Sequence, residues 1–197
     1  MDDSLVSYPG VSPERASLLP GEGFFLPDDI RERRDREAAA DALASVDTAV
    51  IADPDADGLA SVAIVREALG EGALVPAAPH EIEDALERVA AYGEEDVRLF
   101  VCDLCPDRYE YVEEELALAL DHASEVRWFD HHQWDDDVAA AVREAGVDLV
   151  VGDSETECTA DVTARSLDAD LPERLVELAA VTRDHDLWIK EDERSDD

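Results

Sequence analysis

Short apolar runs alternate along the chain with longer stretches in which apolar residues recur at every third or fourth position. Runs of about four to eight residues that are rich in β-branched and aromatic side chains are typical of buried strands. Such runs predict strands at 48–52, 73–78, 97–102, 125–130 and 147–152. The longer stretches predict helices at 28–45, 59–70, 80–93, 109–122, 135–145, 158–167 and 172–182.

Strands that alternate with helices form βαβ units, in which parallel strands are joined by right-handed crossovers. The pattern therefore predicts an α/β fold with a mainly parallel five-stranded sheet and helices on both faces. Three segments are expected: an N-terminal arm with a helix at 1–45, the α/β domain at 46–190, and an acidic tail or truncation point at 191–197.

The chain carries 52 acidic and 16 basic residues, which gives a net charge of −36 at pH 7. Lys190 is the sole lysine, and the acidic residues are spread over the whole sequence. A folded protein with this charge repels itself at low salt, whereas molar salt shortens the Debye length to about 3 Å and screens the repulsion. The composition thus predicts a protein of the acidic haloarchaeal type, adapted to a high-salt cytoplasm.

Neither export nor membrane insertion is indicated by the sequence. No apolar run approaches the about 20 residues that span a bilayer, and the N-terminus lacks the basic and apolar regions of a signal peptide. Cys102, Cys105 and Cys158 are few and odd in number, which fits a reducing compartment. A cytoplasmic location with no membrane partner is expected.

Acidic and histidine residues gather in four segments, three of which follow predicted strands directly. The segments are DPDADG at 53–58, CDLCPD at 102–107, FDHH at 129–132 and TRDHDLW at 182–188. Ligand sites in open α/β sheets lie beyond the carboxyl ends of the strands. The first three segments are therefore expected on one rim of the sheet, and the fourth would reach that rim from a helix.

Carboxylates that converge on one rim repel one another unless a cation lies between them. Carboxylate together with imidazole suits Mn²⁺, Zn²⁺ or Fe²⁺ better than Ca²⁺. Simpler interpretations exist, because DPDADG also fits a solvated turn, Asp103 fits a helix cap, and paired histidines fit a core or a surface. The order of the four segments along the chain favours a metal site.

This order resembles the DHH phosphoesterase superfamily, whose naming motif stands here as Asp130-His131-His132. DPDADGLAS resembles the first motif of that superfamily in the form found in RecJ-like exonucleases, VCDLCPD resembles the second, and RDHDLW resembles the fourth. The resemblance covers about residues 47–188, which is most of the chain.

The resemblance implies two divalent metal ions, with Mn²⁺ favoured and Mg²⁺ as the alternative. The implied metal ligands are Asp53, Asp55, Asp57, Asp103, His131 and Asp184, with Asp186 as a substitute for Asp184. Asp103 would bridge the ions, and the implied catalytic residues are Asp103, His131 and His132, of which His132 either contacts the scissile phosphate or supports the metal ligands from behind. Asp53 stands where several relatives carry histidine, and the extra carboxylate favours a hard ion.

The implied reaction is hydrolysis of phosphodiester bonds in single-stranded DNA or RNA, or in short oligonucleotides, by water that two metal ions activate. Replication or repair proteins are expected as further partners. Two alternatives stay open: a small-molecule phosphodiesterase or pyrophosphatase, and a non-catalytic scaffold in replication or repair. Relatives usually carry a second, substrate-binding domain after the fourth motif, so the chain is expected to be a fragment that lacks it.

Three further residues are candidates for contacts with substrate. Arg108 and Arg183 lie beside two of the motifs and suit a phosphate clamp. Ser154 begins the segment SETECT at 154–159, which leads into a helix. A helix N-terminus of this kind either binds phosphate or is simply capped by the hydroxyl groups that precede it.

Overall fold

The computed structural model describes residues 28–167 and 169–196. The chain divides into two compact units, residues 1–38 and residues 39–197. The described part of the first unit belongs to helix α2 (Asp28–Leu43). The second unit contains the last residues of α2 and every element named below, and it holds the candidate site.

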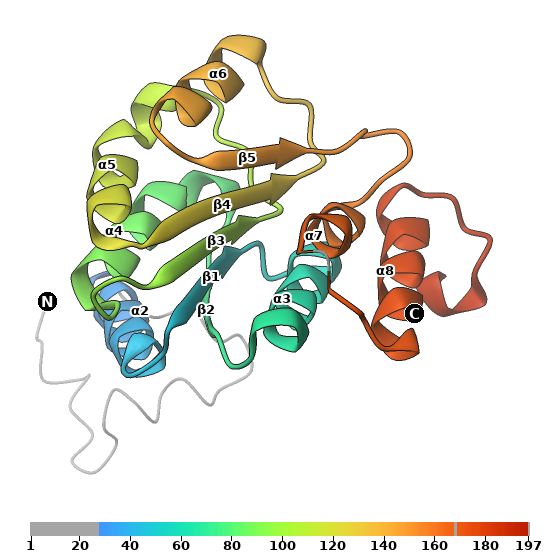
Figure 1. The fold of residues 1–197 in the computed structure, drawn as a ribbon, viewed down its shortest axis with the longest axis horizontal. Coiled ribbons are helices and arrows are strands. Elements are labelled where there is room, and N and C mark those ends of the chain that lie inside the picture. Colours follow the sequence, from blue (N-terminus) through green and yellow to red (C-terminus); the bar gives the residue numbers. More distant parts are fainter. Residues whose placement is uncertain (1–27, 168, 197) are drawn as a thin grey trace, which may run out of the picture. The chain divides into compact units, whose positions relative to one another are not determined.

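The second unit is built on five strands, namely β1 (Thr48–Ala52), β2 (Ala73–Pro76), β3 (Arg98–Cys102), β4 (Glu125–Asp130) and β5 (Asp148–Val151). The strands form one sheet in the order β2-β1-β3-β4-β5, and every neighbouring pair is parallel (Figure 1). The predicted α/β fold with a five-stranded parallel sheet is confirmed. β3 is the central strand, flanked by β1 and β4.

Helices cover both faces of this sheet (Figure 1). One face carries α3 (Ala56–Leu69) and α7 (Thr159–Leu167), and α8 (Glu173–Asp186) packs against both of these helices. The opposite face carries α4 (Ile82–Tyr92), α5 (Glu113–His122) and α6 (Asp136–Glu144). Short 3₁₀ turns η2 (Pro79–Glu81), η3 (Tyr109–Tyr111) and η4 (Glu193–Asp196) complete the described elements. None of the helices in the described ranges is both long enough and apolar enough to cross a bilayer.

Successive residues along the central strands point to opposite halves of the core. Val50 and Phe100 pack in the layer of α3 and α7, whereas Ile51 and Val101 pack in the layer of α4, α5 and α6. All four side chains are almost completely buried. Because both faces of the sheet are covered, β1 and β3 are apolar at nearly every position, which explains the unbroken apolar runs in the sequence.

Two helices that approach the candidate site differ from their predicted bounds. Helix α3 begins at Ala56 and not at residue 59, because the side chain of Asp55 accepts hydrogen bonds from the backbone N–H groups of Asp57 and Gly58 and so caps an earlier first turn. Helix α8 continues to Asp186, beyond its predicted end at residue 182. Both extensions add acidic residues to helix ends at the rim.

Candidate metal centre

The carboxyl ends of β1, β3 and β4 bring three of the predicted segments to one rim of the sheet. Ala52 on β1 pairs with Cys102 on β3, and Cys102 pairs in turn with Phe129 on β4. The residue that follows each of these positions is an aspartate, and the three lie at the same level of the rim: Asp53, Asp103 and Asp130. The predicted convergence of these segments is therefore present in the structure.

His131 lies at the centre of a cluster of carboxylates. Its Nε2 atom is 3.8 Å from Oδ2 of Asp57, 3.8 Å from Oδ1 of Asp103 and 3.2 Å from Oδ2 of Asp186. Two overlapping groups have ligand atoms within 4.8 Å of one another, one formed by Asp57, His131 and Asp186 and the other by Asp103, His131 and His132. Side chains from α3, α8 and the ends of β3 and β4 are thus close enough to hold a metal ion.

The electrostatics of the cluster fit a divalent cation. Asp57 and Asp103 are buried, with exposed fractions of 1% and 4%. Burial, followed by the charges of Asp57 and Asp55, raises the pKa of Asp103 to about 8. Burial also raises the pKa of Asp57. The Nδ1 atom of His131 is buried and has no hydrogen-bond partner among the described residues. A cation between these groups would offset the repulsion that raises the carboxyl pKa values.

Asp130 holds the second histidine of the motif in place. Its Oδ1 atom accepts hydrogen bonds from the backbone N–H of His131 at 2.8 Å and from Nδ1 of His132 at 2.7 Å, while Oδ2 accepts from Nε1 of Trp134 at 2.7 Å. Asp130 is fully buried, and His132 is half exposed. The hydrogen bond to Asp130 is the main cause that raises the pKa of His132 to about 9. With Nδ1 held inward, Nε2 of His132 is left for a ligand at the rim.

The remaining predicted ligands of the first segment lie at the edge of the cluster. Asp55 caps α3 through Oδ1, which accepts from Asp57 and Gly58 at 3.0 Å each. Its charge contributes to the raised pKa of Asp103. Asp53 is half-buried, and burial followed by the charge of Asp55 raises its pKa. Neither residue belongs to the two closest groups of ligand atoms among the described residues.

The fourth segment supplies a different aspartate from the one expected. Asp184 does not join the cluster, because its carboxylate accepts hydrogen bonds from the backbone N–H groups of Glu191 and Asp192 and from the hydroxyl of Ser195. Asp186, the expected substitute, takes the place next to His131. Residues two positions apart on a helix point about 200° away from each other, so only one of the two aspartates can face the rim.

The residues predicted to contact substrate are not gathered at the centre. Arg183 on α8 forms an ion pair with Asp161 on α7, with 2.8 Å between Nη1 and Oδ1. Arg108 is exposed and lies directly before η3. Ser154 is half-buried in the turn that follows β5. Their contact with substrate stays a prediction.

Sequence reasoning missed Thr159, the first residue of α7. The backbone N–H groups of Thr159 and Ala160 donate to the two carboxylate oxygens of Asp57, at 2.6 and 2.8 Å. The hydroxyl of Thr159 donates to Oδ1 of Asp103 at 2.9 Å. The segment at 154–159 was expected to meet phosphate or to cap its own helix, and nothing in its composition indicates that it meets Asp57 and Asp103 instead.

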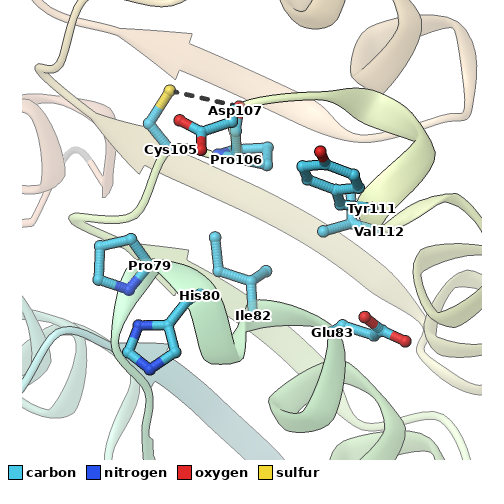
Figure 2. Close-up of a pocket in the computed structure, with 9 residues that line it drawn as sticks. All are labelled: Pro79, His80, Ile82, Glu83, Cys105, Pro106, Asp107, Tyr111 and Val112. Carbon is cyan, nitrogen blue, oxygen red and sulfur yellow. Dashed lines mark hydrogen bonds between the residues drawn. The ribbon is translucent and has the colours of Figure 1, made fainter.

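A hollow of about 420 Å³ opens beside the end of β3 (Figure 2). It begins at Cys105, which follows Asp103 closely in the chain. Figure 2 shows Cys105, Pro106 and Asp107 along one side and Pro79, His80, Ile82 and Glu83 along the other, with Tyr111 and Val112 between them. The hollow thus combines apolar walls with an exposed aromatic ring and two carboxylates, and its lining includes none of the residues gathered around His131.

Comparison with known proteins identifies the fold and no more. No family model matches the chain, and no curated protein is similar to it. Among solved structures, an uncharacterized protein from Helicobacter pylori G27 is similar, with a TM-score of 0.56 and 17% sequence identity. The similarity covers 73% of this chain and 44% of that one. This chain therefore spans less than half the length of that neighbour, and at this identity the likeness concerns the fold alone.

Proposed function

We propose that the chain is a metal-dependent phosphoesterase of the DHH type, which hydrolyses phosphodiester bonds in single-stranded nucleic acid. The observation that carries the proposal is the meeting of His131 with Asp57, Asp103 and Asp186 on one rim. These four side chains come from segments far apart in the sequence, in the order typical of that superfamily. A solvated acidic turn would not need a buried histidine at its centre or two carboxylates with raised pKa values.

The donor set supports a pair of divalent ions, with Mn²⁺ favoured over Mg²⁺. Asp57, Asp103, His131 and Asp186 would hold the ions: His131 would bind one ion through Nε2, and a carboxylate such as that of Asp103 would bridge two. Mixed carboxylate and imidazole ligation favours Mn²⁺, because Mg²⁺ prefers oxygen ligands. Such ions supply positive charge to the phosphoryl oxygens and make the attacking water more acidic.

The side chains of this protein orient the substrate around that centre. Asp130 fixes the ring of His132 through Nδ1, so that Nε2 can donate a hydrogen bond to a non-bridging phosphoryl oxygen. The half-exposed position of His132 leaves it accessible to a phosphodiester at the rim. The buried positions of Asp57 and Asp103 keep bulk water away from these carboxylates, which strengthens their attraction for cations.

One observation favours a second candidate, a phosphodiesterase that acts on short oligonucleotides or small phosphoesters. Long single strands are normally bound by basic grooves, and this chain has 16 basic residues against 52 acidic ones. The hollow that begins at Cys105, two residues after Asp103 in the chain, would instead receive one or two nucleotides, with Tyr111 available to stack on a base. The same metal centre serves both substrates, so substrate length discriminates between the candidates.

Hydrolysis assays with metal-loaded protein in molar KCl test the proposal. Labelled single strands, dinucleotides and pyrophosphate are incubated with Mn²⁺, with Mg²⁺ or with a chelator. We expect Mn²⁺-dependent cleavage that Asp103→Ala lowers at least about 100-fold. Asp121→Ala, which removes an exposed carboxylate from α5, should cleave like the unaltered protein.

Three results would contradict the enzyme. They are the absence of cleavage with every substrate, cleavage that persists in the chelator, and equal rates for Asp103→Ala and Asp121→Ala. Metal analysis adds a second readout, because a non-catalytic scaffold should retain less than one ion per chain.

A further inference from the structure

The N-terminus of α7 is tied to two of the carboxylates that would bind metal. Both oxygens of Asp57 accept backbone hydrogen bonds from the first two residues of this helix, Thr159 and Ala160. The hydroxyl of Thr159 donates to Asp103, which lies 56 residues earlier in the chain. Thr159 is fully buried, so water does not compete for these hydrogen bonds. One residue therefore contacts a ligand from α3 and a ligand from the end of β3.

Capping of α7 does not account for the hydroxyl of Thr159. The backbone N–H of Cys158, which has no backbone acceptor within the helix because it lies at the helix start, donates to Oδ2 of Asp161 at 3.2 Å. The N–H groups of Thr159 and Ala160 are satisfied by Asp57. The hydroxyl instead points out of its helix toward Asp103, whose backbone N–H is bound to the carbonyl of Phe129. With its main chain fixed by the sheet, the carboxylate of Asp103 is oriented by Thr159.

We propose that Thr159 is a positioning residue that sets the metal affinity of the centre. Its hydroxyl holds Oδ1 of Asp103, and its backbone holds Asp57, so that the remaining lone pairs of both carboxylates face His131. Groups that orient metal ligands by hydrogen bonds typically change affinity by about 10–100-fold when they are removed. The inference rests on the proposed metal centre and adds the residue that organises it.

Titration of the full chain with Mn²⁺ by calorimetry, in molar KCl, tests this role. Thr159→Val keeps the shape of the side chain and removes the hydroxyl, and we expect Mn²⁺ affinity to fall about 10–100-fold. Thr159→Ser restores a hydroxyl and should bind within about threefold of the unaltered protein. Thr163→Val is the matched control, because Thr163 lies one turn further along α7, is equally buried, and donates to no carboxylate among the described residues.

The outcomes separate this inference from the proposed function. If the unaltered protein binds no Mn²⁺, both are overturned. If it binds Mn²⁺ and Thr159→Val binds equally well, the metal centre stands and the role of Thr159 is overturned. Equal losses in Thr159→Val and Thr163→Val, or in Thr159→Val and Thr159→Ser, would overturn it too. Circular dichroism verifies folding, and Thr159→Ala replaces Thr159→Val if the valine variant does not fold.

Discussion

Asp103 has a strained backbone conformation and a buried carboxyl group with a raised pKa, a combination typical of residues that serve function and not stability. Its backbone has a φ of 61°, in the left-handed region that few residues other than glycine, asparagine and aspartate adopt. Its carboxylate is buried, and burial with the charges of Asp57 and Asp55 raises its pKa to about 8. Backbone strain and carboxyl groups whose ionisation the surroundings oppose cluster at ligand sites, where a bound cation favours the ionised form.

Asp103→Asn should therefore stabilise the metal-free protein while it abolishes metal binding. Asparagine tolerates the same backbone conformation, its side-chain oxygen can still accept from Thr159, and it cannot ionise, so the unfolded chain no longer gains the free energy of ionising a carboxyl that burial keeps protonated in the fold. We expect the free energy of unfolding in a chelator to rise by at least about 1 kcal/mol, since one pKa unit corresponds to about 1.4 kcal/mol. Urea denaturation at neutral pH measures the change. A variant less stable than the unaltered protein would show that the negative charge of Asp103 is satisfied without metal.

Asp184 and Asp186 offer a matched pair of substitutions on the same helix. Asp186→Asn removes a carboxylate that lies next to His131, so we expect a loss of Mn²⁺ affinity with little change in melting temperature. Asp184→Asn places an amide group among three hydrogen-bond donors, so we expect a lower melting temperature with Mn²⁺ affinity largely kept. Calorimetric titration and thermal unfolding of both variants provide the measurements. The reverse pattern would return the ligand role to Asp184.

At the scale of elements, the start of α3 depends on close contact with the end of β1. A Cβ atom added to Gly58 would lie 2.1 Å from the carbonyl oxygen of Asp53, and because that oxygen belongs to the backbone, no rotamer change relieves the contact. Gly58→Ala should destabilise the protein by about 3 kcal/mol and weaken metal binding, because Asp55 and Asp57 lie in the displaced turn. The close packing of α3 against the end of β1 is therefore sufficient to explain glycine at this position.

Gly72→Ala is the control for that substitution. A Cβ atom at residue 72 would lie 3.5 Å from the side chain of Thr48, an ordinary van der Waals contact. We expect the free energy of unfolding to stay the same or to rise by up to about 1 kcal/mol, because alanine restricts the unfolded chain. Urea denaturation of the two variants side by side tests the comparison. Similar losses in both would mean that any side chain between these elements is harmful.

The sequence predicts this fold well because its strands are buried on both faces. Unbroken apolar runs mark β1 and β3, and helices α4 and α6 keep a clear amphipathic periodicity. The rim follows from topology, since parallel strands end at the same edge of a sheet. Helix starts are less predictable, because the start of α3 depends on a hydrogen bond of one side chain, that of Asp55.

The finer arrangement of the site depends on helix orientation, which the sequence does not encode locally. Asp184 and Asp186 are both aspartates of the same short segment, so the sequence does not distinguish them. Only the packing of α8 against α3 and α7 determines which of them faces His131. Thr159 is likewise an ordinary helix-start residue until the fold brings Asp103 beside it.

At the scale of the whole molecule, 52 acidic residues outnumber 16 basic ones, so ion pairs leave most of the negative charge unbalanced and the net charge is −36. Pairs such as Arg174 with Glu67 and Arg194 with Asp192 lie at the surface, where solvent and salt screen them and each contributes little to stability. The excess acidic charge is spread over many helices, so repulsion acts across the whole surface. Stability should then depend on salt through screening and not through any single contact.

The melting temperature of the metal-free protein should therefore rise on the order of 10 °C between about 0.1 M and about 1 M KCl. Over this range the Debye length falls from about 10 Å to about 3 Å, which removes most of the repulsion between exposed carboxylates. Screening is nearly complete at about 1 M, whereas strengthened hydrophobic burial continues above that concentration and is larger for sulfate than for chloride. Thermal unfolding in KCl, potassium sulfate and sucrose separates these effects. A melting temperature that is flat up to about 1 M KCl, or that sucrose raises equally, would rule out charge repulsion as the main source of salt dependence.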